Sequence, residues 1–247
     1  MYAIDNSGKN AIVTGGGRGL GLEIVHRLAL SGARVIIADI LPDDEVAKNL
    51  DAFTDIPDNR PVFMHCDISD ENECNKLIEE TVNRFGSVDI LVNNAAVSYL
   101  DWIKCFEVNL LAQFYLNEAA IKDMSKRGYG KIVNITTSGT FSGGGAGVKY
   151  NATKGAADSL TRFMAKQYAS EGIHINAVAP GPVLTELMKD YYGEDVFTEH
   201  YLGQMPLKKL IMPENVADTV LFLCSAMSDG VTGETILADG GRVRLCP

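Results

Sequence analysis

Short apolar runs rich in valine and isoleucine recur along this chain, and most of the segments between them carry the periodicity of amphipathic helices. Near-continuous apolar runs are typical of strands that are buried on both faces of a parallel sheet. The alternation therefore predicts an α/β fold, a doubly wound parallel sheet with helices on both faces. The expected strands are AIVT near Val13, RVIIAD ending at Asp39, PVFMHCD ending at Asp67, VDILVNN ending at Asn94, KIVNIT ending at Thr136, IHINAVAP ending at Pro180 and ETILAD ending at Asp239.

The helical patterns and the lack of an internal boundary indicate one domain over 1–247. No linker rich in Ser, Gly or Pro and no repeat of fixed period stands out. Sheets of this kind bind ligands beyond the carboxyl ends of their strands, so chemistry is expected where each apolar run stops. The expected helices cover 20–30, 71–85, 102–124, 150–169 and 214–224.

A glycine-rich turn, TGGGRGLG, follows the first expected strand and opens directly into a helix. Glycines let the backbone approach a pyrophosphate closely, and the first turn of a helix offers free N–H groups to its oxygens. An ordinary strand-to-helix turn is the alternative, because the string alone is weak evidence. The candidate dinucleotide-binding residues here are Gly15, Gly17, Arg18, Gly19, Leu20 and Gly21.

The second expected strand ends at Asp39, close to the offset at which an acid binds the ribose hydroxyls of a dinucleotide. A carboxylate there repels a 2'-phosphate, so Asp39, with Ile40 beside it, favours NAD over NADP. Arg18 is a complication, because a guanidinium nearby accommodates that phosphate. A solvated loop cation is the other interpretation of Arg18.

The third expected strand ends in CDIS, which contains Asp67 and Ile68. Asp67 has two compatible interpretations. It caps the helix that begins at Asp70, or it accepts a hydrogen bond from the adenine amino group.

Tyr150 and Lys154 lie one helical turn apart and share a helix face. Making a tyrosine useful as a base near neutral pH requires its pKa to fall by roughly 3 units, or about 4 kcal/mol. An ammonium about 4 Å away, at an effective dielectric near 20, supplies an interaction of about that size. The pair is therefore a candidate general base, although in isolation the same spacing is found on ordinary helices.

Several separated motifs in order resemble the short-chain dehydrogenase/reductase family over almost the whole length. The resemblance implies a single Rossmann-type domain with its cofactor-binding part at about 1–135 and a substrate-covering segment at about 185–212. The motifs are GKNAIVTGGGRGLG, NNAA at 93–96, VNL at 108–110, YNATK at 150–154, INAVAPGPVLT at 175–185 and DGG at 239–241.

The resemblance also implies roles for individual residues. Tyr150 becomes the catalytic acid/base, and Lys154 lowers its pKa and holds the nicotinamide ribose. Asn109 maintains a proton-relay water, and a hydroxyl residue orients the substrate oxygen. The implied cofactor-side residues outside the glycine turn are Asn94, Ala95, Pro180, Gly181, Val183 and Thr185.

Two residues compete for the hydroxyl position. Counting back about thirteen residues from Tyr150, as the family suggests, gives Thr137, and NITT overlays the family's common NISS in the same way. Ser138 requires a one-residue deletion in the following loop. Thr137 is slightly favoured, since threonine supplies the same donor and acceptor as serine.

Two segments bear on the substrate. The stretch between Asn94 and Asn109 is shorter than is usual in the family, which leaves substrate size open. The segment after Thr185 predicts an apolar lid over a medium-sized or cyclic secondary alcohol or ketone, although packing onto the body explains at least half of its apolar side chains. These are Leu187, Met188, Tyr191, Tyr192, Phe197, Tyr201, Leu202 and Met205.

Charge and composition limit the partners. The formal net charge of -10 argues against a phosphate backbone as partner, and no apolar run is long enough to span a bilayer. We expect no nucleic acid and no membrane partner, no metal site, a small-molecule substrate and a cytoplasmic location. The five scattered cysteines have no C-x-x-C pair, so they are expected as buried apolar side chains in a reducing compartment.

Three functions fit these observations. The favoured one is an NAD-dependent secondary alcohol dehydrogenase, and the family suggests a homodimer or homotetramer. The second is an NADPH-dependent ketoreductase, such as a 3-oxoacyl reductase, which Arg18 favours and Asp39 opposes. The third is a dinucleotide-sensing protein that keeps the fold without catalysis.

Overall fold

A parallel sheet forms the centre of the molecule. The computed structural model describes residues 4–51, 53, 55, 60–185, 188 and 193–245. Within these residues seven parallel strands pair in the order β3-β2-β1-β4-β5-β6-β7, which confirms the expected fold class. The strands are β1 (Asn10–Thr14), β2 (Arg34–Asp39), β3 (Val62–His65), β4 (Ile90–Asn93), β5 (Gly130–Ile135), β6 (Ile173–Pro180) and β7 (Thr235–Ala238).

The strand order reverses between β1 and β4. These two strands pair in parallel, with Ala11 beside Ile90 and Val13 beside Val92. Strands β2 and β3 lie beyond β1 on one side, and β5, β6 and β7 lie beyond β4 on the other. The ends of β1 and β4 therefore form the crevice in which open α/β sheets bind their ligands.

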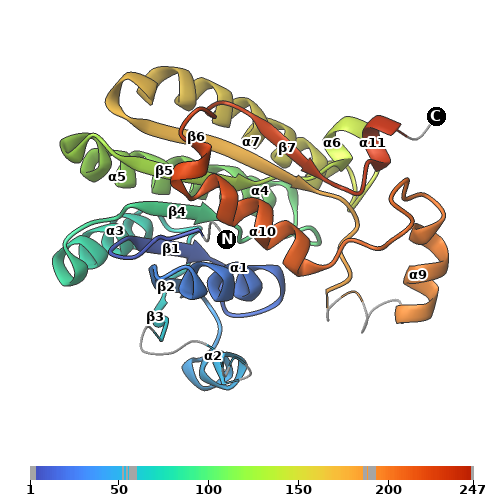
Figure 1. Cartoon of the computed structure of the whole chain (residues 1–247), viewed down its shortest axis with the longest axis horizontal. Coiled ribbons are helices and arrows are strands. Elements are labelled where there is room, and N and C mark those ends of the chain that lie inside the picture. Colours follow the sequence, from blue (N-terminus) through green and yellow to red (C-terminus); the bar gives the residue numbers. More distant parts are fainter. Residues whose placement is uncertain are drawn as a thin grey trace.

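Helices cover both faces of the sheet, and Figure 1 shows α1 (Gly19–Leu30) and α10 (Pro213–Leu223) in front of it. The side chains of β1 alternate between two cores. Ala11 and Val13 pack with α1 and α10, whereas Ile12 packs on the opposite face, where α3, α5 and α7 supply the core. Each fully buried aliphatic side chain stabilises the fold by about 1.5–3 kcal/mol. The helices of this second face are α3 (Glu71–Phe85), α5 (Ala112–Arg127) and α7 (Val148–Tyr168).

The helix expected over 102–124 is three consecutive pieces. It comprises α4 (Trp102–Phe106), a π-helical turn over Glu107–Leu111, and α5. A π-helical turn inserts one residue into the helical repeat and is frequent at functional sites. Periodicity alone does not show such an insertion, because the apolar stripe continues on both sides of it.

Within the residues that the structure describes, four helices were not expected from the sequence. In α2 only Val46 and Leu50 are buried, so its apolar stripe is too short to be recognised. Helix α9 lies at the right side of the view in Figure 1. These helices are α2 (Asp43–Leu50), α6 (Gly139–Ser142), α9 (Glu194–Leu202) and α11 (Arg242–Leu245).

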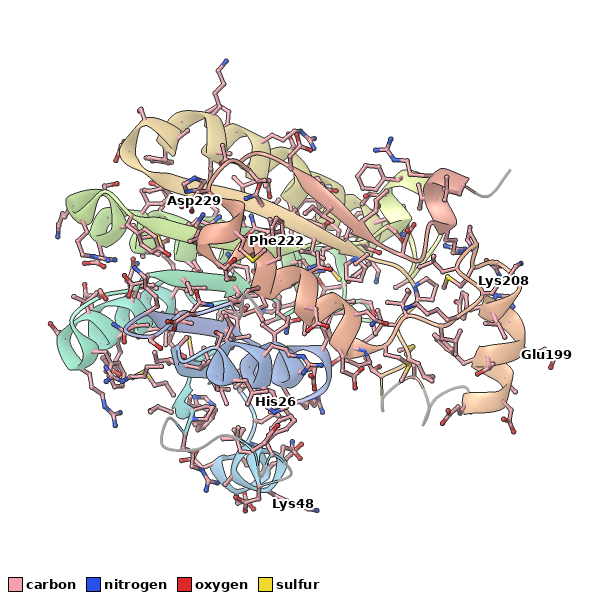
Figure 2. The ribbon with its side chains drawn as sticks, viewed as in Figure 1. His26, Lys48, Glu199, Lys208, Phe222 and Asp229 are labelled. Atoms are coloured by element: carbon pink, nitrogen blue, oxygen red, sulfur yellow. The ribbon has the colours of Figure 1, made fainter. Side chains whose placement is uncertain are left out.

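A histidine ties α1 to the segment that follows α2. His26 lies on the α2 side of α1 (Figure 2), and its ring stacks on Phe53 with a centroid separation of 3.9 Å. Its Nε2 atom lies 2.8 Å from Oδ1 of Asp55. These contacts fix part of the connection between α2 and β3 on the body of the protein.

The four described cysteines, Cys66, Cys74, Cys105 and Cys224, are buried free thiols, as expected. Cys246 lies outside the described residues. In the part of the chain that the structure describes, no helix combines the length and the apolar character that a membrane span requires.

Candidate active site

The glycine-rich turn after β1 is folded tightly against the start of α1. Gly15 and Gly19 have φ values of 62° and 56°, in the left-handed region that favours glycine. A Cβ atom on Gly21 would lie 2.0 Å from the Gly15 carbonyl oxygen, so only glycine allows this helix to pack so closely on the turn. The third glycine of a dinucleotide-binding turn has the same role.

Asp39, at the end of β2, lies directly beside this turn. Its Oδ2 atom accepts a hydrogen bond from the Gly17 N–H at 2.9 Å, and Oδ1 accepts one from the Ile40 N–H at 2.8 Å. The Leu41 N–H is a third donor, at 3.3 Å from Oδ1. Because a carboxylate has about four acceptor sites, Asp39 retains capacity for a ribose hydroxyl.

The residues of the turn fit a dinucleotide. The first N–H groups of a helix have no intrahelical partner, and in α1 these belong to Gly19, Leu20 and Gly21. A Cβ atom built on Gly19 meets no heavy atom within 4 Å, so there is open space beside these donors. A pyrophosphate oxygen placed there would receive backbone hydrogen bonds and the favourable end of the helix dipole.

The side chain of Arg18 is exposed. Within the described residues its guanidinium forms no hydrogen bond or ion pair, which agrees with a solvated loop cation.

Asn94 and Ala95 join β4 to the glycine turn. The Asn94 side-chain amide donates to the carbonyl oxygens of Thr14 and Gly15, at 3.0 and 3.1 Å. The N–H groups of Asn94 and Ala95 both donate to the Thr14 hydroxyl. Asn94 thus holds the turn in shape across the point where the strand order reverses.

The capping interpretation of Asp67 is wrong. Asp70 is the N-cap of α3, and its carboxylate accepts from the Asn72 N–H at 2.8 Å. The exposed Asp67 instead accepts from the N–H and the hydroxyl of Ser69, because a side chain three residues before the cap closes its own local turn first. Ile68, beside it, is buried in the core.

Lys154 and Tyr150 lie on α7, where that helix passes the end of β5. The Lys154 side chain is fully buried, and its Nζ atom donates to the Ile135 carbonyl oxygen at 2.7 Å. The same Nζ atom lies 5.6 Å from the centroid of the Tyr150 ring. This hydrogen bond fixes an ammonium group at the carboxyl edge of the sheet, next to a phenol.

Burial shifts the pKa values of both Lys154 and Tyr150. Burial lowers the pKa of Lys154 to about 8, and the Asp158 carboxylate opposes this fall. Burial raises the pKa of Tyr150 to about 12. In the chain by itself the direction is thus opposite to the expected lowering of the Tyr150 pKa, and desolvation of the phenolate is the cause.

The hydroxyls of Thr137 and Ser138 follow β5 and lie close to the start of α7. A Cβ atom on Gly139 would lie 2.5 Å from the Asn151 Oδ1 atom, so this turn packs against the residue next to Tyr150. Thr137 is half-buried, and its hydroxyl oxygen accepts from the Gly139 N–H at 3.2 Å. Ser138 is buried, and its N–H donates to the Pro180 carbonyl oxygen.

Asn109 lies in the π-helical turn and is fully buried. Its amide group exchanges two hydrogen bonds with the backbone of Val97, both of 2.8 Å. The same amide nitrogen also donates to the Thr153 hydroxyl at 3.0 Å. Asn109 thus ties the segment after β4 to the residue that precedes Lys154.

The segment after β6 brings Pro180, Gly181, Val183 and Thr185 to the same edge of the sheet. The Gly181 N–H donates to the Ala238 carbonyl oxygen at 3.1 Å, and Val183 forms an isolated bridge with Ile211. The Thr185 hydroxyl accepts from the Met188 N–H at 3.3 Å.

Most described side chains of the expected lid belong to the body of the protein. Phe197 and Met205 are buried, and Tyr201 packs against the core cluster that contains α1 and α10. Met188 is partly buried and Leu202 is 36% exposed. Leu187, Tyr191 and Tyr192 lie outside the described residues.

Two residues at the site were missed at the level of sequence. The Asn49 side chain donates to the Gly17 carbonyl oxygen at 2.9 Å, but α2, which carries it, was not expected. Asp158 is buried one turn beyond Lys154. Its spacing of four from Lys154 was a usable signal, since charged residues at that spacing share a helix face.

Comparison with known proteins decides the family. A family model described as enoyl-(acyl carrier protein) reductase matches residues 15–242. The chain is 31% identical to the 7alpha-hydroxysteroid dehydrogenase of Escherichia coli, over 99% of both chains. The chain belongs to the short-chain dehydrogenase/reductase family. It is therefore an oxidoreductase that binds a nicotinamide dinucleotide and acts on a small molecule.

Other members of the short-chain dehydrogenase/reductase family are similar over almost the same length. The 3-oxoacyl-[acyl-carrier-protein] reductase of Aquifex aeolicus is 36% identical, over 95% of this chain and 97% of its own. The crystal structure of levodione reductase matches this chain with a TM-score of 0.89 and 29% sequence identity, over 97% of this chain and 99% of that one.

Proposed function

We propose that this protein transfers a hydride between NAD(H) and a secondary alcohol or its ketone, of medium size and apolar or cyclic. The observation that carries the proposal is the fully buried Lys154, whose ammonium is held by the Ile135 carbonyl beside the Tyr150 ring. A buried cation next to a phenol is costly to a fold, and active sites are where such perturbed groups gather.

In the oxidative direction, Tyr150 takes the proton of the substrate hydroxyl. The bound cofactor supplies the hydride acceptor, so the C–H electron pair leaves the carbinol carbon as the C=O bond forms. Lys154 stabilises the Tyr150 phenolate that must exist before this step. Because burial raises the pKa of Tyr150, the phenolate needs a nearby positive charge to form near neutral pH.

Thr137 is the hydroxyl that we assign to the substrate oxygen. Its oxygen accepts from the Gly139 N–H, which leaves its own hydrogen free to donate to a developing alkoxide. Ser138 is 2% exposed, so it offers less access to a substrate. Thr137 thus remains favoured over Ser138.

Asn109 acts as a positioning residue in this proposal. Its amide hydrogens donate to Val97 and Thr153, and its Oδ1 atom accepts from the Val97 N–H. One lone pair of Oδ1 remains for a relay water. The expected relay through Asn109 stays a prediction.

Asp39 supports NAD as the cofactor. Three N–H donors hold its carboxylate beside Gly17, where the 2' position of the ribose is expected. A phosphate at that position would meet a fixed negative charge. An NADP-dependent enzyme would need Arg18 to outweigh this repulsion.

An NADPH-dependent ketoreductase is the second candidate. The exposed Arg18 favours it, as does the similarity to a 3-oxoacyl-[acyl-carrier-protein] reductase. Asp39 and the net charge of -10 oppose it, since an acidic chain repels an acidic carrier. A third candidate, a dinucleotide-sensing protein, predicts cofactor binding without turnover.

Initial rates over a panel of linear, cyclic, steroid, sugar-type and acyl secondary alcohols, with NAD and separately with NADP, test these candidates. We expect NAD-linked turnover of an apolar or cyclic alcohol. Turnover with NADP alone would favour the ketoreductase, and tight cofactor binding without turnover on the panel would favour the sensing protein.

We also propose a cytoplasmic homodimer or homotetramer. Large apolar side chains are exposed on α5 and α7, among them Phe114 and Phe163, at 41% and 67% exposure. Light scattering coupled to size exclusion measures the assembly, and a monomer at micromolar concentration would contradict this part of the proposal.

A further inference from the structure

Asp158 is a buried acid that the proposed mechanism has not used. It is 4% exposed and lies on α7, one turn after Lys154. Burying a carboxylate is costly unless hydrogen bonds and opposite charges compensate. The groups that surround Asp158 therefore indicate what it does.

Hydroxyl groups from two other elements bind the Asp158 carboxylate. Its Oδ1 atom accepts from the Thr235 hydroxyl of β7 at 3.1 Å, and Oδ2 accepts from the Thr140 hydroxyl of α6 at 3.2 Å. Burial raises the pKa of Asp158, and the hydrogen bonds from Thr235 and Thr140 oppose this rise. In the described part of the chain, its charged neighbours are Lys154 and the exposed Arg162, both on α7.

The contact with Thr140 connects Asp158 to the proposed substrate-orienting residue. The Thr140 hydroxyl oxygen lies 2.9 Å from the Thr137 carbonyl oxygen and 3.2 Å from Oδ2 of Asp158. The single hydrogen of this hydroxyl is thus shared between the Thr137 carbonyl and the buried acid in a three-centre hydrogen bond. On the other side of Thr137, the Thr136 hydroxyl donates to the Val178 carbonyl oxygen at 3.3 Å, so the turn is held on both sides.

Resting on the function proposed above, we propose that Asp158 is a positioning residue of the reaction. Its carboxylate anchors the 136–140 turn to α7 and supplies the negative charge that faces the Lys154 ammonium. Burial lowers the pKa of Lys154, and Asp158 limits that fall. Without Asp158, Lys154 would lose its charge at lower pH and stop stabilising the Tyr150 phenolate there.

An NMR titration of Lys154 in protein labelled with ¹³C-lysine tests the charge role without any substrate. The Lys154 signal is assigned from its absence in Lys154→Gln. In Asp158→Asn we expect its midpoint to fall by about one to two pH units, the size of the interaction between unit charges one helical turn apart at an effective dielectric near 20. Glu79→Gln, which removes an exposed charge on α3, is the matched control. An unchanged midpoint in Asp158→Asn, or an equal shift in the control, would overturn this role.

Kinetics test the positioning role. On the alkaline side of the pH profile, the pH at which kcat falls should be lower in Asp158→Asn than in the wild type. In Asp158→Glu this pH should return towards the wild-type value. Thr140→Val keeps the Asp158 charge but removes the hydroxyl that holds the 136–140 turn. We expect kcat to fall about tenfold, while KM and the pH of the alkaline fall stay unchanged. An unaltered kcat would overturn the proposal that Asp158 anchors this turn. If circular dichroism shows that Asp158→Asn does not fold, the Asp158→Glu and Thr140→Val variants still test the positioning role. A wild-type protein without turnover would refute the proposed function, while the NMR titration would still decide the charge role.

Discussion

The buried ammonium of Lys154 should make the stability of this protein depend on pH in a specific way. Burial lowers the pKa of Lys154 from 10.5 to about 8. Between these two values the unfolded chain binds more protons than the folded one, so the free energy of unfolding rises with pH. Below pH 8 the charged lysine costs the fold about 3 kcal/mol, and this cost disappears as the pH approaches 10.5.

The perturbation that isolates this effect is Lys154→Met, which keeps an unbranched side chain one atom shorter and removes the charge. It also leaves the Ile135 carbonyl without its donor, a loss of about 1–3 kcal/mol that does not depend on pH. Titratable groups that both proteins share cancel in the difference. The stability of the wild type relative to the variant should therefore rise by about 2.5 kcal/mol between pH 7 and pH 10.

Urea unfolding of both proteins at pH 7, 8, 9 and 10, followed by circular dichroism, measures this difference. The two curves of unfolding free energy against pH should approach or cross as the pH rises. Parallel curves would refute the argument, because they would mean that Lys154 titrates with the same pKa in the folded and unfolded chain.

Four further substitutions test other parts of the site. Asp39→Ala should reduce the preference for NAD over NADP at least tenfold, measured as the ratio of kcat/KM values, and an unchanged ratio would remove Asp39 from its role. Gly21→Ala should lower the free energy of unfolding by about 2 kcal/mol or more, because its Cβ atom would lie 2.0 Å from the Gly15 carbonyl oxygen. The loss is measured as a lower Tm, and a wild-type Tm would show that the backbone of the turn shifts at little cost. Thr137→Ala should lower kcat about a hundredfold and Ser138→Ala much less, and the reverse order would exchange their roles.

The centre of the sheet could be predicted from the sequence because its strands are buried on both faces. RVIIAD is apolar almost throughout, and β2 occupies the expected residues. Helix α2 was missed because it buries only Val46 and Leu50. The burial of Met205 could not be predicted either, since an apolar residue in such a segment fits a lid and a core equally well.

The candidate site was predictable in its positions and less so in its energetics. The spacing of Tyr150 and Lys154 indicated that they share a helix face, but the sequence does not give the depth of burial that raises one pKa and lowers the other. Similarly, CDIS contains an acid suited to capping, but local backbone geometry made Asp70 rather than Asp67 the cap. Such outcomes depend on three-dimensional packing, which spacing does not encode.

The most direct test of the proposed chemistry is kcat for Tyr150→Phe beside the wild type, with NAD and the best alcohol of the panel. The variant removes one oxygen atom, and NAD affinity is measured in parallel by calorimetry. We expect kcat to fall at least a thousandfold while the Kd for NAD changes less than threefold. Undiminished kcat would contradict the assignment of Tyr150 as the acid/base.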